Sequence, residues 1–496
     1  MLTHVANGDS RLSFWSRVRR YAVPPSMIET ATARREVGDW AGACAAAGID
    51  IDLQPRTVAL RHGQDVAARL RADLRRLAPD LLRWHLPRIA PDGLLRPGLT
   101  ITLARYGAEG RAGPYPVHLV VRTPPAWADA GQRIGLALWD GSAGSHSAPD
   151  ACRHPHPRPS RRYRLDLHRH LWDARRAPEL RPRSGAADQA TADGPVLAGW
   201  EASGLAGGEA SGLAGGEASV LAGGEASGAV PPEYGCAVGR WADEARIVLA
   251  AEGRSGGPVL VRLGARRRLL LHLDDGPDGA GSPALRIEVA SDRDVAALPL
   301  PVLPDAATWV PPDLELLRSG AIDADRLHPL VASALVPGHA PVGPPRAADP
   351  AGEPRVVECR GERHRIGLVD GVLAPLDHDP DEIRREELLV ALTGTPLPCL
   401  QAIDRAHRRP DGLSGVRERL DHGDTAGALA VVEGLLGPEA VLRDGPLRDE
   451  LETAARRRIT YGLYRAGLMG PSPERIRLDD RRRPTRARRS RDALFY

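Results

Sequence analysis

The clearest alternation of apolar and polar positions lies between residues 356 and 376. Three short runs predict strands there, at Val356–Arg360, His364–Val369 and Val372–Leu376. Asp370-Gly371 suits a two-residue hairpin turn between the second and third runs, because both central positions of that turn need a positive φ. We therefore expect a three-stranded meander, which needs a packing partner on one face because so small a sheet is not stable alone.

Helical spacing replaces the alternation after residue 378. Asp379 at the N-cap, Pro380 at the first helical position and Glu382 at the third form a typical helix start. Apolar residues then recur at helical spacing up to Leu463, and glycines and prolines separate the runs. These runs predict about five short helices, packed as a small helical array beside the meander. A DNA-reading helix-turn-helix is disfavoured, because its recognition helix would be Ala426–Leu436, which has no basic residue.

The first third of the chain changes from helical to strand patterning. Apolar residues at helical spacing predict helices over 26–37, 58–77 and 79–86. Alternating runs predict a short strand over 49–53, between these helices, and then strands over 99–106, 117–123, 133–139 and 163–168. Helices followed by neighbouring strands are typical of an α+β domain with an antiparallel sheet.

Two segments far apart in the chain share one pattern. Residues 38–43 and 423–428 both read Gly-Asp-x-Ala-Gly-Ala. In each, the Asp is suited to cap the helix that follows, and the small residues let a neighbouring helix approach closely. This Gly-Asp joint resembles the turns of tetratricopeptide-type helix pairs, which implies helical hairpins. The rest of that repeat's pattern is missing, and independent use of a good capping turn is the simpler explanation of the two copies.

Residues 174–232 predict a linker without a stable fold. Their centre is an eight-residue repeat that begins at Glu201, Glu209, Glu217 and Glu225. Paired glycines disfavour a helix, and one leucine in each unit buries too little apolar surface to offset the entropy lost on ordering.

The segment after this linker predicts a small α+β unit. Helical spacing over 241–251 is followed by strand patterns over 259–263, 269–273 and 285–289. Residues 299–312 are rich in proline and predict an extended segment. Asp313 is expected to cap a helix over Leu314–Leu317, and a second helix is expected over Leu327–Leu335.

Together these patterns predict a multidomain α+β protein: N-terminal helices with an antiparallel sheet, a small α+β middle domain, and a C-terminal β-meander followed by a short helical array. The expected units are an N-terminal domain over 11–173, a disordered linker over 174–232, a middle domain over 233–336, a Pro/Gly-rich joint over 337–354, a C-terminal domain over 355–470 and a basic tail over 471–496.

The composition excludes several kinds of catalytic group. The 496 residues include no lysine, which excludes a Walker-A lysine, a Schiff base and a Ser–Lys dyad. Five scattered cysteines form no Cys-x-x-Cys pair, residues 1–26 have no secretory h-region, and no apolar run approaches membrane-spanning length. We therefore expect a cytoplasmic protein with free thiols and no membrane partner.

The basic excess lies in the tail. Residues 471–496 carry nine arginines against four acidic residues, while the chain's net charge is +3, so the rest is close to neutral. Six of these arginines are candidates for binding a polyanion without sequence preference, because no aromatic residues accompany them for base stacking: Arg481, Arg482, Arg483, Arg486, Arg488 and Arg489.

Candidate catalytic patterns all have simpler structural readings. Gly253–Gly257 matches the nucleophile elbow, but it is expected to follow a helix and precede a strand, the reverse of the order the elbow needs. Two types of zinc ligand, thiol and imidazole, gather in a short span, but their Cys-x-His-x-His spacing does not match a zinc site: Cys152, His154, His156, His168 and His170. His378, between two aspartates, suits a general base and equally a helix start.

The leading hypothesis is a non-catalytic cytoplasmic adaptor or protein-binding module, without a metal or cofactor. One alternative is an enzyme with a site near Trp84-His85 or near His378. Another is nonspecific association with nucleic acid through the tail.

Overall fold

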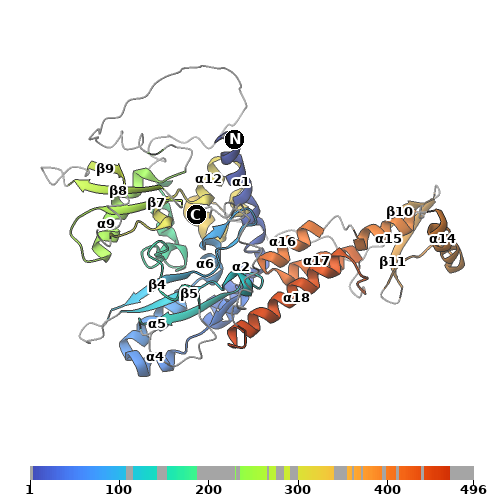
Figure 1. Ribbon diagram of the computed structural model, residues 1–496, viewed down its shortest axis with the longest axis horizontal. Coiled ribbons are helices and arrows are strands. Elements are labelled where there is room, and N and C mark those ends of the chain that lie inside the picture. The colour runs from blue at the N-terminus through green and yellow to red at the C-terminus, as the bar shows by residue number, and fades with distance from the viewer. Residues whose placement is uncertain are drawn as a thin grey trace, which may run out of the picture.

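The computed structural model in Figure 1 describes residues 4–107, 116–141, 154–186, 230, 235–264, 267–274, 284–290, 300–339, 355–359, 362–369, 372–393, 398–408, 413–436 and 441–469. These residues form a mixed α+β structure with several separate small sheets, as the sequence predicts. The boundaries of the six expected units stay a prediction.

The N-terminal sheet has four strands in the order β1-β6-β5-β4. Their bounds are β1 Ile49–Ile51, β4 Thr100–Tyr106, β5 Val117–Arg122 and β6 Ile134–Trp139. The three predicted strands β4, β5 and β6 pair antiparallel, and β1 joins β6 in parallel. Two further short strands, β2 Arg88–Ile89 and β3 Leu94–Leu95, pair with each other.

The strand expected over 163–168 is wrong. Arg164 makes one isolated bridge to Thr102, and the chain then turns, with the Leu167 amide donating to the Arg164 carbonyl. The Arg164 guanidinium also bonds the Asp166 carboxylate two residues ahead. Alternation there still places Tyr163 and Leu165 in the core.

Helices cover this sheet and lie beside its edge. Their bounds are α1 His4–Tyr21, α2 Pro25–Glu36, α3 Trp40–Ala46, α4 Pro55–His62, α5 Gln64–Arg76 and α6 Pro79–His85. The single helix expected over 58–77 is two, because Gly63 adopts a φ of 94° that ends α4. Short 3-10 turns complete the region, at η1 Ala126–Ala128 and η3 Arg169–Leu171.

The middle segment has the expected helix, three-stranded sheet and helices. Its elements are η7 Val238–Arg240, α9 Trp241–Ala251, β7 Val259–Leu263, β8 Arg267–Asp274, β9 Ala284–Val289, α11 Asp305–Thr308, α12 Pro312–Arg318, η8 Ala324–Arg326 and α13 Pro329–Leu335. The sheet is antiparallel in the order β7-β8-β9. The segment expected to be extended over 299–312 contains α11, and α12 begins at Pro312 after an N-cap at Pro311, so Asp313 does not cap it.

The start of the expected linker is folded. Residues 174–186 include η4 Ala177–Glu179 and α7 Leu180–Arg183, and both lie against α13. Ala177 and Leu180 are buried because they pack into the large hydrophobic cluster, which also contains Val230. The prediction of a linker from residue 174 is therefore wrong for these residues, and the eight-residue repeats lie outside the described residues.

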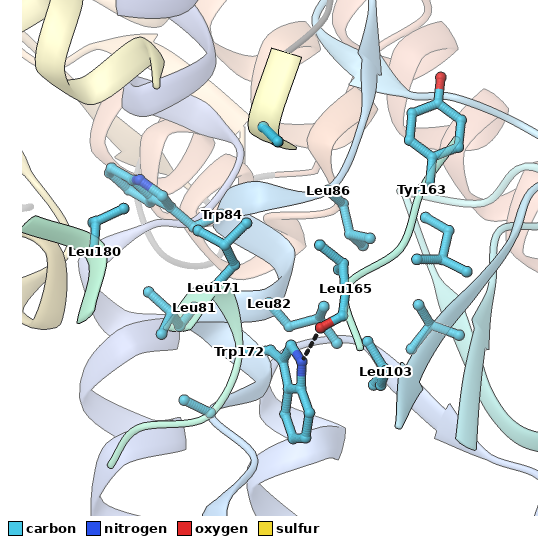
Figure 2. Close-up of a cluster of buried hydrophobic side chains, with 14 of the residues drawn as sticks. Leu81, Leu82, Trp84, Leu86, Leu103, Tyr163, Leu165, Leu171, Trp172 and Leu180 are labelled. Atoms are coloured by element: carbon cyan, nitrogen blue, oxygen red, sulfur yellow. Dashed lines mark hydrogen bonds between the residues drawn. The ribbon is translucent and has the colours of Figure 1, made fainter. Parts of the chain in front are cut away.

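One hydrophobic cluster joins the N-terminal and middle segments. Figure 2 shows its centre, where α6 contributes Leu81, Leu82 and Trp84. The Trp172 indole lies nearby and donates to the Leu165 carbonyl at 3.0 Å. These two segments are called the body below.

The C-terminal meander and helices follow the sequence prediction closely. The meander is β10 Arg355–Cys359, β11 Glu362–Val369 and β12 Val372–Pro375, antiparallel in that order. The helices are α14 Pro380–Thr393, α15 Pro398–Arg408, α16 Leu413–His422, α17 Thr425–Leu436 and α18 Pro446–Arg465. Asp379 accepts a bond from the Asp381 amide, in agreement with the expected helix start. The last helix, α18, is 20 residues long rather than short.

Helices α16, α17 and α18 lie against the body, and the meander with α14 and α15 lies at their far end (Figure 1). A second, smaller hydrophobic cluster joins the meander to the helices through Ile366, Ile403, Val416 and Leu447. The helical array is therefore a bridge between the body and the meander.

Candidate functional site

The Trp84-His85 pair lies in a buried polar network that holds three helices together. Asp313 of α12 accepts from the Arg19 guanidinium of α1 at 2.7 Å and from the Trp84 indole at 3.0 Å. Arg19 and Asp313 side chains are each 1% exposed. Burial lowers the pKa of His85 to about 3, so this imidazole is neutral. These contacts fix α1, α6 and α12 and leave the pair no access to a substrate.

The second predicted catalytic position, His378, is also engaged in packing. Its ring stacks on that of His364, with centroids 4.1 Å apart. Its Nδ1 lies 3.4 Å from Glu382. The neighbouring Asp377 bonds the Arg365 side chain instead, and this bond lowers the pKa of Asp377 to about 2. The aspartate therefore does not orient the histidine as a catalytic pair requires.

The pattern that resembles a nucleophile elbow also follows its structural reading. Residues 253–257 form a turn between α9 and β7, in the order expected. His154 is buried, and its two ring nitrogens lie 2.9 Å and 2.8 Å from the carbonyl oxygens of His156 and Thr123, which can only accept. Cys152 lies outside the described residues. Among the described residues, no group of His, Cys, Asp and Glu could hold a metal ion. The six tail arginines, 481–489, lie outside the described residues.

One of the larger cavities lies where the helical array meets the body. This cleft, called the joint cleft, has a volume of about 420 Å³, within the size range of small-ligand pockets. It is lined from the body by α2, the end of α3 and the turn before β6, and from the array by the α16–α17 joint and α18. The lining residues are Pro24, Ser26, Met27, Thr30, Ala45, Ala46, Gly48, Arg83, Ala130, Gly131, Arg133, Leu420, Gly423, Asp424, Thr425, Ala426, Ala454, Arg457 and Arg458.

The two Gly-Asp joints seen in the sequence belong to the helical hairpins on either side of this cleft. Asp39 caps α3 by accepting from the Gly42 amide at 2.8 Å, and Asp424 caps α17 by accepting from Gly427 at 2.9 Å. Each Asp also bonds an arginine five residues before it, Arg34 or Arg419. The α2–α3 and α16–α17 hairpins therefore share one local construction.

The glycines of these joints differ in what surrounds them. Gly423 has a φ of +87° and lies against Gly131, so a Cβ there would lie 2.1 Å from the Gly131 carbonyl oxygen. Gly38 has a φ of +79°, and a Cβ added there would have nothing within 4 Å. Only the C-terminal joint therefore uses its glycine for a close backbone approach to the body.

Arg83 forms the floor of the cleft where the two parts meet. Its guanidinium is buried, with Arg83 1% exposed, and donates to four carbonyl oxygens. Three belong to the body, at Ala22, Ala47 and Gln132, and the fourth is His422 at 2.7 Å. Burial lowers the pKa of Arg83 to about 10, so it stays charged at neutral pH. No carboxylate lies within ion-pair distance of it among the described residues.

The charges around the cleft are mainly positive. Four of its lining residues are arginines and one, Asp424, is acidic. Arg133 bonds Asp50, and Arg457 bonds Asp421 at 2.6 Å. Arg458 is exposed and has no ion pair or hydrogen bond among the described residues. A ligand in this cleft would meet an excess of cationic side chains.

A polar contact holds α18 on the sheet next to the cleft. The Tyr461 hydroxyl donates to Asp50 at 2.7 Å, and Arg465 pairs with Asp50 and Asp52. Hydrogen bonding to Arg133 and Tyr461 lowers the pKa of Asp50 despite partial burial, which raises it. A smaller cleft of about 240 Å³ lies beside this contact, with Arg122, His154 and Tyr464 in its lining.

None of the described helices combines the length and apolar character needed to cross a membrane. No family model, curated protein or solved structure matches the chain. The cleft must therefore be interpreted from its own chemistry.

The sequence does not predict these residues as a site. The repeated Gly-Asp pattern singles out Gly423 and Asp424 only as a capping joint between two helices. Arg83, Arg133, Arg457 and Arg458 were missed because each is an ordinary helix or strand residue by local pattern. The three consecutive arginines 456–458 on α18 were a local sign of a basic segment.

Proposed function

We propose that the chain is a non-catalytic binding protein of the cytoplasm, an adaptor that takes a segment of a protein partner in the joint cleft. The observation that carries this proposal is the cleft itself, which lies between two helical hairpins and has four arginines against one acidic residue. Stacked helical hairpins commonly present concave surfaces to other proteins. The excess of positive charge favours an acidic segment.

The contents of the cleft support binding over catalysis. Its lining contains no histidine or cysteine among the described residues. Its one carboxylate, Asp424, already bonds Arg419 and the Gly427 amide, so it is poorly placed to take a proton from a substrate. The cytoplasmic placement is supported by Cys44, Cys236 and Cys399, which are free thiols.

The two alternatives have less support in the described residues. For an enzyme, the smaller cleft brings Asp52, Arg122 and His154 together, but its volume of about 240 Å³ is below the usual range for ligand pockets. For nucleic acid, the support is the arginine density of the tail, residues 471–496.

The test is capture of partners by the tagged, full-length protein in its own host, with and without nuclease. We expect a stoichiometric protein that survives nuclease, is lost with Arg458→Glu and is kept with Arg71→Glu. Arg71 is a matched control because it is an exposed arginine on α5, outside the cleft lining, and has no ion pair among the described residues.

Two outcomes would count against the proposal. Capture that is equal in both variants would remove the joint cleft from partner binding. Loss of all captured material on nuclease treatment would favour nucleic acid as the partner.

A further inference from the structure

We infer that the joint cleft binds a phosphoryl group, held between Arg458, Arg457 and the first amides of α17. This inference rests on the proposed function, because it names the chemistry that the cleft would recognise on a partner. The group could belong to free phosphate or to a phosphorylated segment, and both share the same tetrahedral dianion.

The first support is the balance of charge. The lining holds four arginines, and two of them, Arg133 and Arg457, pair with carboxylates outside it. Arg83 and Arg458 have no ion pair among the described residues, so two positive charges remain for a ligand, which a dianion matches and a monoanion does not. The attraction between charges scales with their product, and a dianion therefore gains about twice as much as a carboxylate at the same place. Guanidinium groups also match the oxygen spacing of phosphate, which they bind through paired N–H donors.

The second support is the state of each arginine. Arg133 is committed to Asp50 by two hydrogen bonds, and Arg457 bonds Asp421 through one nitrogen at 2.6 Å. Arg458 has no such partner among the described residues, so its donors are available. Adjacent positions on α18 thus supply the Arg458 guanidinium, which has no partner among the described residues, and the Arg457 guanidinium, which is half exposed.

The third support is the buried charge of Arg83 beneath the cleft. Its hydrogen bonds go to carbonyl oxygens, which satisfy its donors but do not neutralise its charge. A buried cation without a carboxylate beside it is costly in a medium of low dielectric constant. An anion in the cleft would lower that cost, because Arg83 lies in the cleft lining.

The helix terminus completes the arrangement. Thr425 and Ala426 begin α17 and line the cleft, and amides at these positions have no acceptor within a helix. The side chain of Asp424 takes the Gly427 amide and leaves the two earlier amides without that acceptor. Amides of this kind favour an anion, as an addition to the arginines.

Because the lining comes from both parts, a bound phosphoryl group would also tie the helical array to the body. Arg83 belongs to α6, whereas Arg457 and Arg458 belong to α18. Phosphate should therefore slow hydrogen exchange across α16–α18, as well as bind.

The experiment is calorimetric titration of the full-length protein with inorganic phosphate, phosphoserine and acetate, each at constant ionic strength. We expect saturable binding of one phosphate per chain, and acetate at least tenfold weaker. Phosphoserine binding more tightly than phosphate would identify a phosphorylated segment as the source, and the reverse would identify free phosphate.

Four variants test whether phosphate binds at this cleft. Arg458→Glu should weaken phosphate at least tenfold, and Arg71→Glu should not change it. Thr425→Pro removes one amide donor at the first helical position, where proline is well tolerated, and should weaken phosphate several-fold without changing a charge. Replacing the six tail arginines with glutamine should leave binding intact: Arg481, Arg482, Arg483, Arg486, Arg488 and Arg489.

The inference is overturned if phosphate does not saturate, if acetate binds equally well, or if only the tail variant loses binding. These results are separable from the proposed function, because no partner is present in the titration. Partner capture that depends on Arg458 without phosphate binding would reject the phosphoryl group and keep the adaptor. Phosphate binding without any effect of Arg458→Glu on capture would keep the phosphoryl site and reject the joint cleft as the place where a partner binds.

Discussion

Replacing Gly423 with alanine should loosen the helical array from the body, whereas the same change at Gly38 should not. Both glycines precede a capping Asp and have similar positive φ values, +87° and +79°. Both substitutions therefore carry the same conformational penalty, about 1 kcal/mol for an L-residue in the left-handed region. Only at Gly423 would the new Cβ also overlap a backbone atom, at 2.1 Å from the Gly131 carbonyl oxygen.

The size of the extra effect follows from the contact beside it. Relief of the overlap requires the joint and the Gly131 turn to separate by about 1 Å, since real Cβ contacts of this kind lie beyond 3.0 Å. His422 is the residue before Gly423, and its carbonyl oxygen accepts from Arg83 at 2.7 Å. Such a shift lengthens that bond past hydrogen-bonding range, and a bond to a charged group contributes about 1.5–3 kcal/mol. Gly423→Ala should therefore favour opening of the array about 10–150-fold more than Gly38→Ala.

Hydrogen exchange of the intact protein, followed by mass spectrometry, measures this directly. We expect faster exchange throughout α16–α18 in Gly423→Ala, and only a local change at the α2–α3 joint in Gly38→Ala. Equal exchange of α16–α18 in the two variants would refute the reasoning, because it would mean that the Gly131 contact does not hold the array.

Three further changes have definite expected outcomes. Burial lowers the pKa of His422 to about 2, so the unfolded state takes up a proton first as pH falls below 6.5, and stability is lost on acidification. Between pH 7.5 and pH 5 this should cost about 2 kcal/mol in urea unfolding, and His422→Phe should remove that part of the dependence. Asp313→Leu should cost about 3–5 kcal/mol because it strands the Arg19 charge, and the double variant with Arg19→Met should unfold at higher urea than Asp313→Leu alone. Tyr461→Phe loses the 2.7 Å bond to Asp50 and should destabilise the α18 contact by about 1 kcal/mol, seen as faster exchange at the end of α18.

Local patterns predicted the elements well where neighbours in sequence decide them. The start of α14 at Asp379-Pro380 and both Gly-Asp joints followed from capping chemistry within six residues. Four of the five expected N-terminal strands are present for the same reason, because alternation matches burial on a sheet.

The failures come from contacts that no local pattern contains. Asp313 looks like a helix cap, but it lies within α12 and pairs with Arg19, 294 residues earlier in the chain. Residues 163–168 alternate like a strand, yet the chain turns there after one isolated bridge to Thr102. Local sequence patterns could not identify Arg83 as a site residue, because its role depends on carbonyl groups from four separate segments.

The position of His422 in the sequence also affects when the body can finish folding during synthesis. The carbonyl that completes the Arg83 shell lies 339 residues after it. At a synthesis rate of about 5–20 residues per second, that acceptor emerges from the ribosome roughly 20–70 s after the arginine does. With one acceptor missing, the Arg83 guanidinium needs water to satisfy its donors in that interval, so the α6 end of the nascent body should stay hydrated. Completion of the body should then coincide with arrival of α16, so closure of the Arg83 shell is a late step relative to synthesis of α6.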